Sequence, residues 1–384
     1  MKVLVIGNGA REHALIWKLR QSKDVEEIFC TMGNAGINEI AEPINIKAED
    51  INSLIKFVKD NEIDFTVVGP EIPLSLGIVD EFVNNGLRIF GPTKSAARLE
   101  TSKVFAKEFM KRYSIPTSGF EKFNINEKSN VLDYLSDVKY PVVIKADGLA
   151  AGKGVVICDN QQNAKSAIVD FFDLKIFGTA GDNIIIEEFL NGAEASVFAV
   201  SDGTNYIILP PARDHKKILD GEKGKNTGGM GSFAPAYNIV NDESIGKIKD
   251  RIIEPVLKLM KEEGNEFKGC LYCGLMIDER NNPYVIEFNV RFGDPETQVV
   301  LPLIKSDFLK LLLTSHEGNL KDYNLETMDH FCCSVVLSSR GYPDNYDTGY
   351  EISGLNKITD DCIVFHAATK RTDDGKVVSS GGRV

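Results

Sequence analysis

The stretch KVLVIGNGAREHAL, residues 2–15, decides the fold of the amino-terminal part of this sequence. A short apolar run enters a glycine turn, and a helical pattern follows directly. Glycines let backbone amides approach a ligand and a helix N-terminus favours an anion, so this turn is typical of a phosphate site. A tight turn without a ligand would look the same. A dinucleotide fingerprint would place a glycine at Glu12 and an acidic residue at the end of the second strand, so NAD binding is disfavoured.

Strands and helices alternate in the pattern of the first hundred residues. The apolar runs after the first strand are EEIFCT, DFTVVGP and RIFGP, and the helical patterns cover His13–Leu19, Ile51–Val58 and Ile78–Val83. This order predicts a doubly wound parallel sheet. A helical run over residues 95–113 follows without a strand, so we expect a new domain to begin near Thr101.

Two further domains are predicted downstream. Residues 121–190 combine strands and helices around a glycine loop, in a segment of the size of a lid. The strand-rich residues that continue to residue 320 predict a platform beneath this lid. Short apolar runs, among them CCSVVLSS and CIVFHAATK, predict a small β-rich domain at the end. The expected fold is α/β and α+β multidomain, with domains over 1–101, 102–320 and 321–384.

Composition excludes several classes of protein. The 384 residues carry 44 Lys and Arg against 56 Asp and Glu, so no sequence-wide field favours DNA or anionic lipid. No apolar stretch approaches the roughly 20 residues that cross a bilayer, and the opening strand lacks the features of a signal peptide. We expect a soluble, cytoplasmic protein with no nucleic-acid or membrane partner.

Cysteines and histidines do not predict a zinc site or a disulfide framework. The seven cysteines are an odd number without regular spacing, which fits free thiols in a reducing compartment. Cys270 and Cys273 form a CxxC, but in a predicted strand an offset of three places the two sulfurs on opposite faces.

The stretch YVIEFNVRFGDPETQ, residues 284–298, carries the most specific chemistry. On a strand of period two, Tyr284, Ile286, Phe288 and Val290 share an apolar face, and Glu287, Asn289 and Arg291 share a polar one. A carboxylate and an amide oxygen two residues apart suit magnesium, and an arginine beside them can grip a phosphoryl oxygen. A solvent-exposed face of an ordinary strand is the alternative.

Three glycine-rich or acidic segments are further candidates. ADGLAAGKG, residues 146–154, joins two strands and predicts a hinged phosphate clamp, with Lys145 needing an anionic partner if buried. IIIEEFLNGAEAS, residues 184–196, suits a hinge whose backbone pairs with adenine and whose Glu194 accepts from ribose. The basic loops PPARDHKK (210–217) and GEKGKNTGGMG (221–231) suit an anionic substrate. A solvated lysine, a charged strand end and a disordered loop are the respective alternatives.

Taken in chain order, these motifs resemble the glycinamide ribonucleotide synthetase family of ATP-grasp enzymes. The matching segments are GNGAREHAL, VVGPEIPL, GPTKSAARLETSK, VIKADGLAAGKGV, IIEEFL, NTGGMG, GLMID and VIEFNVRFGDPETQ, and they cover nearly the whole chain. The resemblance implies ATP-dependent ligation of glycine to 5-phosphoribosylamine in de novo purine synthesis, with Mg²⁺ or Mn²⁺, through glycyl phosphate. Positioning and charge neutralisation should then dominate over general-base catalysis.

The resemblance also implies a set of site residues. The ATP phosphates would be bound by Lys103, Lys145, Gly148, Gly152, Lys153 and Gly154. Adenosine would be held by Glu187, Leu190 and Glu194, and the metal by Glu287 and Asn289. Arg291, with Lys145, would be catalytic. Phosphoribosylamine or glycine would face Asn8, Gly9, Glu71, Asp214, Thr227, Gly228, Gly229 and Arg291.

Departures from the family pattern accompany these matches. Leu275 and Met276 stand where many ATP-grasp enzymes carry another carboxylate, so metal binding is expected to rely on phosphates and water. Arg213 and Lys225 are unusual on the expected substrate side. The family's last domain continues past GGRV, whereas this chain stops at Val384, which indicates a truncated domain.

Two other functions remain open at this level. Another ATP-grasp carboxylate–amine ligase or carboxylase would share the lid and the metal strand. A non-catalytic nucleotide-binding module would keep the fold without turnover. The expected assembly is a monomer or weak dimer.

Overall fold

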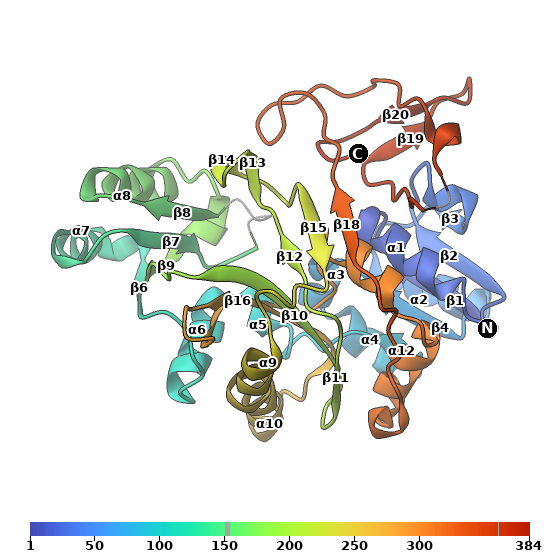
Figure 1. Ribbon diagram of the computed structural model, residues 1–384, viewed down its shortest axis with the longest axis horizontal. Coiled ribbons are helices and arrows are strands. Elements are labelled where there is room, and N and C mark those ends of the chain that lie inside the picture. Colours follow the sequence, from blue (N-terminus) through green and yellow to red (C-terminus); the bar gives the residue numbers. More distant parts are fainter. Residues whose placement is uncertain (150–153, 360) are drawn as a thin grey trace.

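The computed structural model describes residues 1–149, 154–359 and 361–384. Figure 1 shows the lid at the left, the amino-terminal sheet at the right, and the carboxyl-terminal segment above that sheet. The predicted α/β and α+β fold, with a parallel amino-terminal sheet and a small β-rich end, is confirmed.

The amino-terminal sheet is parallel throughout and has the strand order β3-β2-β1-β4-β5. Its strands are β1 (Lys2–Ile6), β2 (Glu27–Thr31), β3 (Glu42–Ile44), β4 (Phe65–Val68) and β5 (Ile89–Phe90), and its helices are α1 (Ala10–Leu19), α2 (Ile51–Asp60), α3 (Glu71–Leu76) and α4 (Ile78–Asn84). In β1, Leu4 and Ile6 pack into one apolar cluster and Val3 and Val5 into another. Burial on both faces explains why this strand is a continuous apolar run.

The lid is an antiparallel sheet with an apolar core of its own. Its elements are β6 (Phe120–Asn124), α7 (Lys128–Asp137), β7 (Val142–Ala146), β8 (Val155–Cys158), α8 (Gln161–Ile168) and β9 (Asn183–Glu188). Phe171 and Ile186 belong to this core, which is separate from the two clusters of the rest of the molecule. A body with its own core can move as a unit.

The platform is a second antiparallel sheet, with the strand order β11-β10-β16-β17. Its elements are β10 (Ala193–Asp202), β11 (Tyr206–Ile208), α9 (Asp242–Ile248), α10 (Glu254–Glu262), β16 (Lys268–Ile277), β17 (Pro283–Asn289), α11 (Thr297–Val300) and α12 (Phe308–Glu317). Cys270 and Cys273 of β16 lie in different apolar clusters, so their predicted placement on opposite faces is confirmed. All seven cysteines are free.

The predicted helical run over residues 95–113 is divided at Ser102. The two pieces are α5 (Arg98–Thr101) and α6 (Lys103–Arg112). Ser102 is extended and its Oγ accepts a hydrogen bond from the Phe105 amide, which makes it the N-cap of α6. Asp147, in the lid, accepts hydrogen bonds from Ser102 Oγ at 3.0 Å and from the Val104 amide at 2.8 Å. The lid therefore contacts the start of α6.

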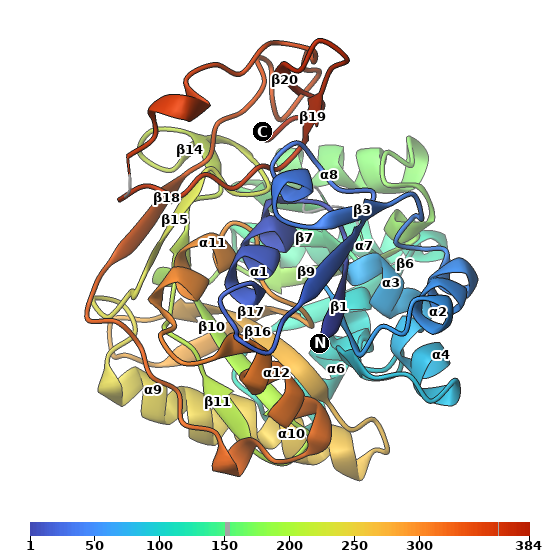
Figure 2. The same ribbon diagram turned by 90° about the vertical axis from the view of Figure 1, so that its right-hand side faces the viewer.

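The last segment of the chain is less regular than predicted. Its strands are β18 (Cys332–Val335), β19 (Thr369–Arg371) and β20 (Val377–Ser379). β18 joins β12 (Arg213–Asp214) and β15 (Gly231–Ala234) in a three-stranded sheet, and Figure 2 shows it running beside β15. In the apolar run CIVFHAATK only Thr369 and Lys370 belong to a strand, β19. The backbone of residues 366 and 367 bonds the Asn34 and His13 side chains instead.

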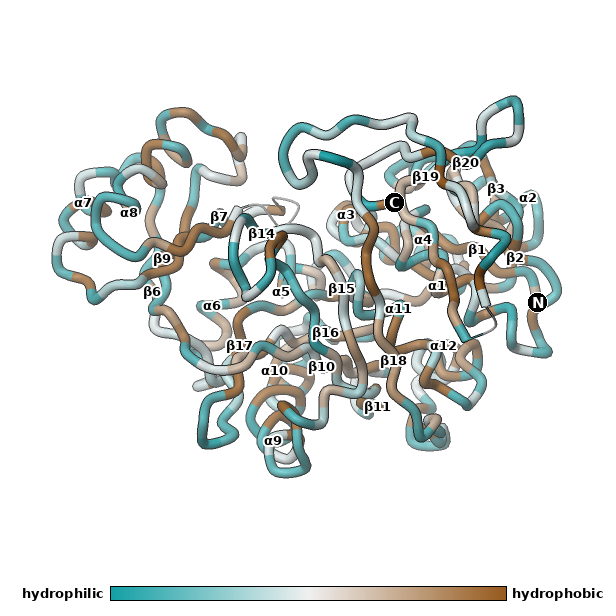
Figure 3. Tube along the Cα trace, turned by 45° about the horizontal axis from the view of Figure 1, so that its top comes forward, coloured by the Kyte–Doolittle hydropathy of each residue, from teal (hydrophilic) through white to brown (hydrophobic). Residues whose placement is uncertain are grey.

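The basic segment that could have been a disordered loop is a hairpin of β13 (Lys217–Leu219) and β14 (Lys223–Asn226). Figure 3 shows the brown, apolar residues along the strands of the sheets, with teal residues in the connections. Among the residues described, no helix is long and apolar enough to span a membrane.

A buried histidine of helix α1 joins the last segment to the amino-terminal part of the molecule. His13 Nδ1 accepts a hydrogen bond from the His366 amide at 2.8 Å, and the two rings lie 5.8 Å apart. Burial, and then the nearby His366, lower the pKa of His13 to about 4. His13 is therefore neutral in the folded protein at ordinary pH.

This lowered pKa predicts a loss of stability in acid. Between pH 6.5 and about 4 the unfolded chain binds a proton at His13 that the folded protein does not, so the free energy of unfolding falls as pH falls. The slope from this group is at most about 1.4 kcal/mol per pH unit. Denaturant unfolding of His13→Asn, whose Oδ1 can replace Nδ1 as acceptor, should show a shallower slope. An unchanged slope would contradict the assignment.

Candidate active site

A buried carboxylate joins the lid to helix α6. Glu187 of β9 lies with Oε1 2.9 Å from Lys145 Nζ and Oε2 3.0 Å from Lys107 Nζ, and Ser118 Oγ donates to Oε2 at 2.8 Å. All three charged side chains are at most 5% exposed. Burial raises the pKa of Glu187, but Lys145 and then Lys107 outweigh it, so the net shift is downward. The anionic partner that Lys145 requires is therefore supplied by the protein.

Lys107 was not identified from the sequence. It lies four residues after Lys103 and therefore on the same face of α6. This spacing is the feature of the sequence that could have indicated Lys107 as a site residue. Burial lowers its pKa to about 8, and the Glu187 carboxylate opposes that shift. Lys107 Nζ also donates to Thr117 Oγ1 at 2.7 Å and to Ser118 Oγ at 2.8 Å, so with Glu187 all three of its protons have a partner.

Lys103 faces the same space from the N-terminus of α6. Its Nζ donates to the Gly148 carbonyl at 3.3 Å. Burial lowers the pKa of Lys103, Glu287 opposes that shift and Lys145 adds to it. Gly148 packs closely, since a Cβ there would lie 2.9 Å from Ala180 Cβ, and the Gly154 carbonyl accepts from the Ala146 amide. Gly152 and Lys153 lie outside the described residues.

The predicted alternation of strand β17 is wrong over residues 284–286. Val285, Phe288 and Val290 pack into the core, whereas Ile286 lines the pocket together with Glu287. The register with β16 shifts here, since Gly274 pairs with Glu287 and Leu275 pairs with Val285, which leaves Ile286 as a bulge. A bulge inserts one residue and exchanges the faces of the strand beyond it. The freed Ile286 carbonyl accepts from Lys145 Nζ at 3.1 Å.

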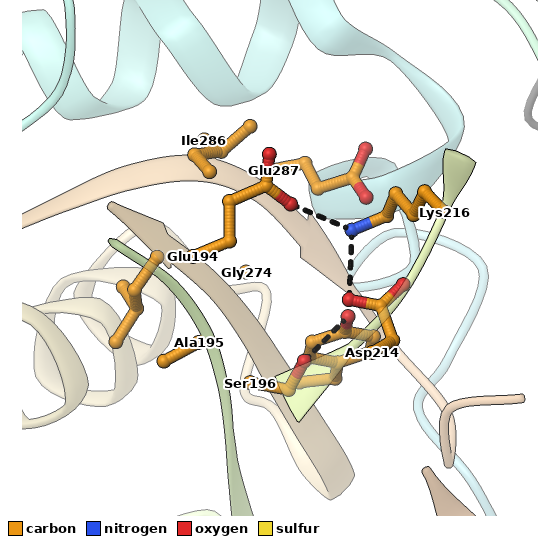
Figure 4. Close-up of a pocket in the computed structure, with 10 residues that line it drawn as sticks. Glu194, Ala195, Ser196, Asp214, Lys216, Gly274, Ile286 and Glu287 are labelled. Carbon is orange, nitrogen blue, oxygen red and sulfur yellow. Dashed lines mark hydrogen bonds and ion pairs between the residues drawn. The ribbon is translucent and has the colours of Figure 1, made fainter. Parts of the chain in front are cut away.

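A pocket lies between Glu287 and strands β10 and β12 (Figure 4). Lys216, which the sequence did not identify as a site residue, projects into it, with Nζ 3.2 Å from Glu194 Oε2 and 3.1 Å from Asp214 Oδ1. Burial would lower the pKa of Lys216, but the acidic groups around it, with Asp214 the strongest, raise it well above its usual range. Lys216 is therefore a permanent cation beside the candidate ribose and metal residues.

Arg291 follows β17 and is held by two carboxylates. Its Nη2 lies 2.9 Å from Glu100 Oε1 and donates to Asn289 Oδ1 at 3.0 Å, and its Nε lies 3.4 Å from Glu71 Oε2. Burial would lower the pKa of Arg291, but Glu100 and Glu71 outweigh it. Glu100 was not identified from the sequence, and its other oxygen accepts from the Val290 amide at 2.7 Å. These contacts orient Arg291 at the edge of the sheet.

The predicted phosphate turn is partly capped by its own glutamate. Glu12 Oε2 accepts from the Gly9 amide and its Oε1 accepts from Arg11 Nε, both at 2.6 Å. One donor of the turn is therefore already used. Asn8 remains exposed and donates to the Gly33 carbonyl at 3.1 Å. Glu71 follows β4, the strand next to β1, so it and Asn8 lie at the same carboxyl edge of the sheet.

The Thr227–Gly229 turn is anchored on two sides. Thr227 Oγ1 donates to the Lys216 carbonyl at 2.7 Å and accepts from the Gly229 amide at 3.0 Å. Gly229 has a φ of +103°, and a Cβ there would lie 2.3 Å from Pro295 Cδ. This close approach requires glycine. Leu190 lies in the connection between β9 and β10.

Three domain models of one protein family match this sequence. The amino-terminal domain of phosphoribosylglycinamide synthetase matches residues 1–100, its ATP-grasp domain residues 101–297 and its carboxyl-terminal domain residues 332–384. The chain belongs to this family. The resemblance noted from the motifs is thereby confirmed.

The chain is similar over its full length to two bacterial proteins named phosphoribosylamine–glycine ligase. The protein from Caldanaerobacter subterraneus is 49% identical over all of this chain and 91% of its own length. That from Salmonella typhi is 47% identical over all of this chain and 90% of its own length. The Thermotoga maritima enzyme of the same name has a solved structure, 36% identical with a TM-score of 0.84, covering 100% of this chain and 91% of that one.

More distant structures share the fold alone. The biotin carboxylase of Campylobacter jejuni is 16% identical with a TM-score of 0.70, over 99% of this chain and 87% of that one.

The buried ion pairs predict a large effect of neutralising Glu187. In Glu187→Gln two buried ammonium groups lose their carboxylate, so the free energy of unfolding should fall by roughly 3 kcal/mol. Denaturant unfolding measures this change. The control is Glu188→Gln, one residue along the same strand with an exposed side chain, which should change little. Equal stability of the two variants would contradict the positioning role of Glu187.

Proposed function

We propose that this protein is a phosphoribosylamine–glycine ligase that joins glycine to 5-phosphoribosylamine at the expense of ATP. The observation that carries the proposal is that Lys103 bonds the glycine loop of the lid while Lys145 bonds the carbonyl next to Glu287, in a chain similar over its full length to relatives of that name. Small-molecule substrates, a cytoplasmic location and a monomer or weak dimer belong to the same proposal.

The domain division that we propose follows the predicted boundaries. Residues 1–101 form the amino-terminal domain, and residues 102–320 the ATP-grasp domain with its lid at 121–190. Residues 321–384 form the last domain. The separate apolar core of the lid supports this division.

ATP is proposed to lie between the lid and the platform. Lys103 and Lys145 face its phosphates, and Gly148 and Gly154 are proposed to bind them as well. Gly152 and Lys153, which lie outside the described residues, belong to the same proposal. The side chain of Glu187 is committed to Lys107 and Lys145, so we assign it to holding Lys145 rather than to adenosine. Adenine then pairs with the backbone near Leu190, and the ribose hydroxyls with Glu194.

The residues of β17 fit a magnesium or manganese ion. Burial raises the pKa of Glu287, but Lys216 and Lys145 outweigh it and keep the carboxylate ionised. Asn289 Oδ1 accepts one hydrogen bond, from Arg291, which leaves its second lone pair free. Because the described residues contain no group of three acidic, histidine or cysteine ligands, substrate phosphates and water would complete the shell. Bound there, the ion would neutralise charge on the phosphoryl group.

The chain's own residues then position two successive transfers. The glycine carboxylate attacks the γ-phosphorus of ATP, giving glycyl phosphate and ADP. The amine of phosphoribosylamine attacks the glycyl carbonyl, phosphate leaves with the C–O electron pair, and the amine releases a proton. Arg291, oriented by Glu100 and Glu71, stabilises the negative charge of both steps. Asn8, Gly9, Glu71, Asp214 and the Thr227–Gly229 turn are proposed to face phosphoribosylamine and glycine.

The proposal predicts a strict substrate requirement. With ATP and magnesium, ADP release should need both glycine and freshly generated phosphoribosylamine, and omission of either should stop turnover. Bicarbonate in place of glycine should give no turnover, which separates this activity from that of a carboxylase. Release of ADP with bicarbonate alone, or with neither acceptor, would overturn the proposal.

The assignment of Glu287 as a metal ligand predicts that its replacement by glutamine lowers kcat. Glu287→Gln removes the charge of the proposed ligand, so kcat should fall by about 100-fold or more. Added manganese should restore part of the rate if the site is weakened rather than lost. Glu279→Gln, an exposed glutamate of the same hairpin, is the control and should keep full activity. Near-normal turnover of a folded Glu287→Gln protein would refute the assignment.

A further inference from the structure

The last residues of the chain are close to two segments that we propose to face the substrates, the turn at Asn8 and the Thr227–Gly229 turn. Asn34 Nδ2 donates to the Asn8 carbonyl at 2.9 Å and to the His366 carbonyl at 2.8 Å, so it joins the amino-terminal turn to the last domain. The Ala368 amide in turn donates to the Arg383 carbonyl at 3.1 Å. The chain end in Figure 1 accordingly lies beside β19 and above α1.

The side chain of Arg383 points away from its own domain. Its Nη2 lies 2.7 Å from Asp294 Oδ2, and its Nη1 donates to the Gly228 carbonyl and, at 3.4 Å, to that of Gly229. Asp294 Oδ1 accepts from Gln298 Nε2 at 2.7 Å, so the carboxylate is fixed on both sides. The Arg383 side chain is 21% exposed, so this ion pair is largely shielded from water. Shielding makes such a pair stronger than one on the surface.

A second side chain of the last domain reaches the same turn. Tyr342 OH accepts a hydrogen bond from the Gly228 amide at 2.9 Å. Both backbone groups of Gly228 are therefore bound by the last domain, the carbonyl by Arg383 and the amide by Tyr342. Glycine backbones are intrinsically free, so these bonds restrict a turn that would otherwise sample many conformations.

We propose that Arg383 and Tyr342 are positioning residues for phosphoribosylamine. They hold the Thr227–Gly229 turn against Asp294, which follows Arg291 by three residues, and thereby set the distance between that turn and the arginine that meets the reacting groups. The inference rests on the proposed function, because it assigns the Thr227–Gly229 turn to the binding of phosphoribosylamine rather than of ATP. ATP is proposed to contact the lid side, with which neither residue has a described hydrogen bond or ion pair.

Steady-state kinetics of variants at these positions test the proposal. Arg383→Ala should raise KM for phosphoribosylamine by about 10- to 100-fold, because a loosened turn misplaces the substrate. KM for ATP should stay within about twofold, since the adenosine and phosphate contacts are elsewhere. Tyr342→Phe removes only one oxygen, so it keeps the packing of the ring and should raise the same KM by several-fold. Both variants are compared at their thermal midpoints to confirm folding.

Arg371→Ala is the matched control. Arg371 is another arginine of the last domain, and it pairs with Glu39 of the amino-terminal domain at an exposed site. Its loss removes an interdomain ion pair without touching the glycine turn, so both KM values should remain those of the wild type. A general loosening of the last domain would instead affect Arg371→Ala and Arg383→Ala alike and would overturn the proposal.

The outcomes separate this inference from the proposed function. A wild-type protein that does not turn over phosphoribosylamine and glycine disproves the function itself. A wild-type protein that does, with folded Arg383→Ala and Tyr342→Phe variants whose KM for phosphoribosylamine is unchanged, disproves only the positioning role. Equal increases in both KM values would also disprove it. If Arg383→Ala does not fold, Tyr342→Phe and Arg383→Lys decide by the same comparison.

Discussion

The ion pairs of Glu187 with Lys107 and Lys145 are the constraint on which the candidate site depends. Three charged groups that are almost fully buried are tolerable only if they stay together, because any one left alone would carry a large desolvation cost. Glu187 belongs to β9, Lys145 to β7 and Lys107 to α6, so one carboxylate joins two lid strands to the helix beneath them. The position of Lys145 is therefore set before any anion binds.

On the platform, a bulge in β17 orients the groups of the candidate site. With Ile286 left out of the ladder, its carbonyl turns to Lys145 and Glu287 enters the pocket, while Val285 and Phe288 both remain in the core. The strand thus packs an apolar face and presents a charged one without strict alternation. The Lys145 ammonium group joins the lid to the platform, since it contacts Glu187 of β9 and the Ile286 carbonyl of β17.

The remaining charges form two separate sets, in each of which a cation lies between two carboxylates. Lys216 lies between Glu194 and Asp214, and Arg291 between Glu100 and Glu71. In each set, against the opposing effect of burial, the two carboxylates raise the pKa of the cation above its usual range. Such a fixed field needs little reorganisation when a triphosphate arrives, which is how preorganised sites stabilise developing charge.

The pattern of apolar runs was sufficient to predict the parallel sheet, the separate lid and the β-rich end, because strand and helix periods are local properties of the chain. Motifs also indicated Lys103, Lys145, Glu287 and Arg291. Lys107, Glu100, Lys216 and Arg383 were not selected in this way, since a charged residue in a helix or loop looks the same whether it faces water or another domain. The exchange of faces in β17 was likewise invisible, because a bulge is defined by the register of two strands far apart in sequence. The sequence by itself therefore predicts which residue types stand near one another along the chain. The partner of each charge is decided only by the tertiary structure, because a buried charge is stable only when packing of distant segments brings an opposite charge to it.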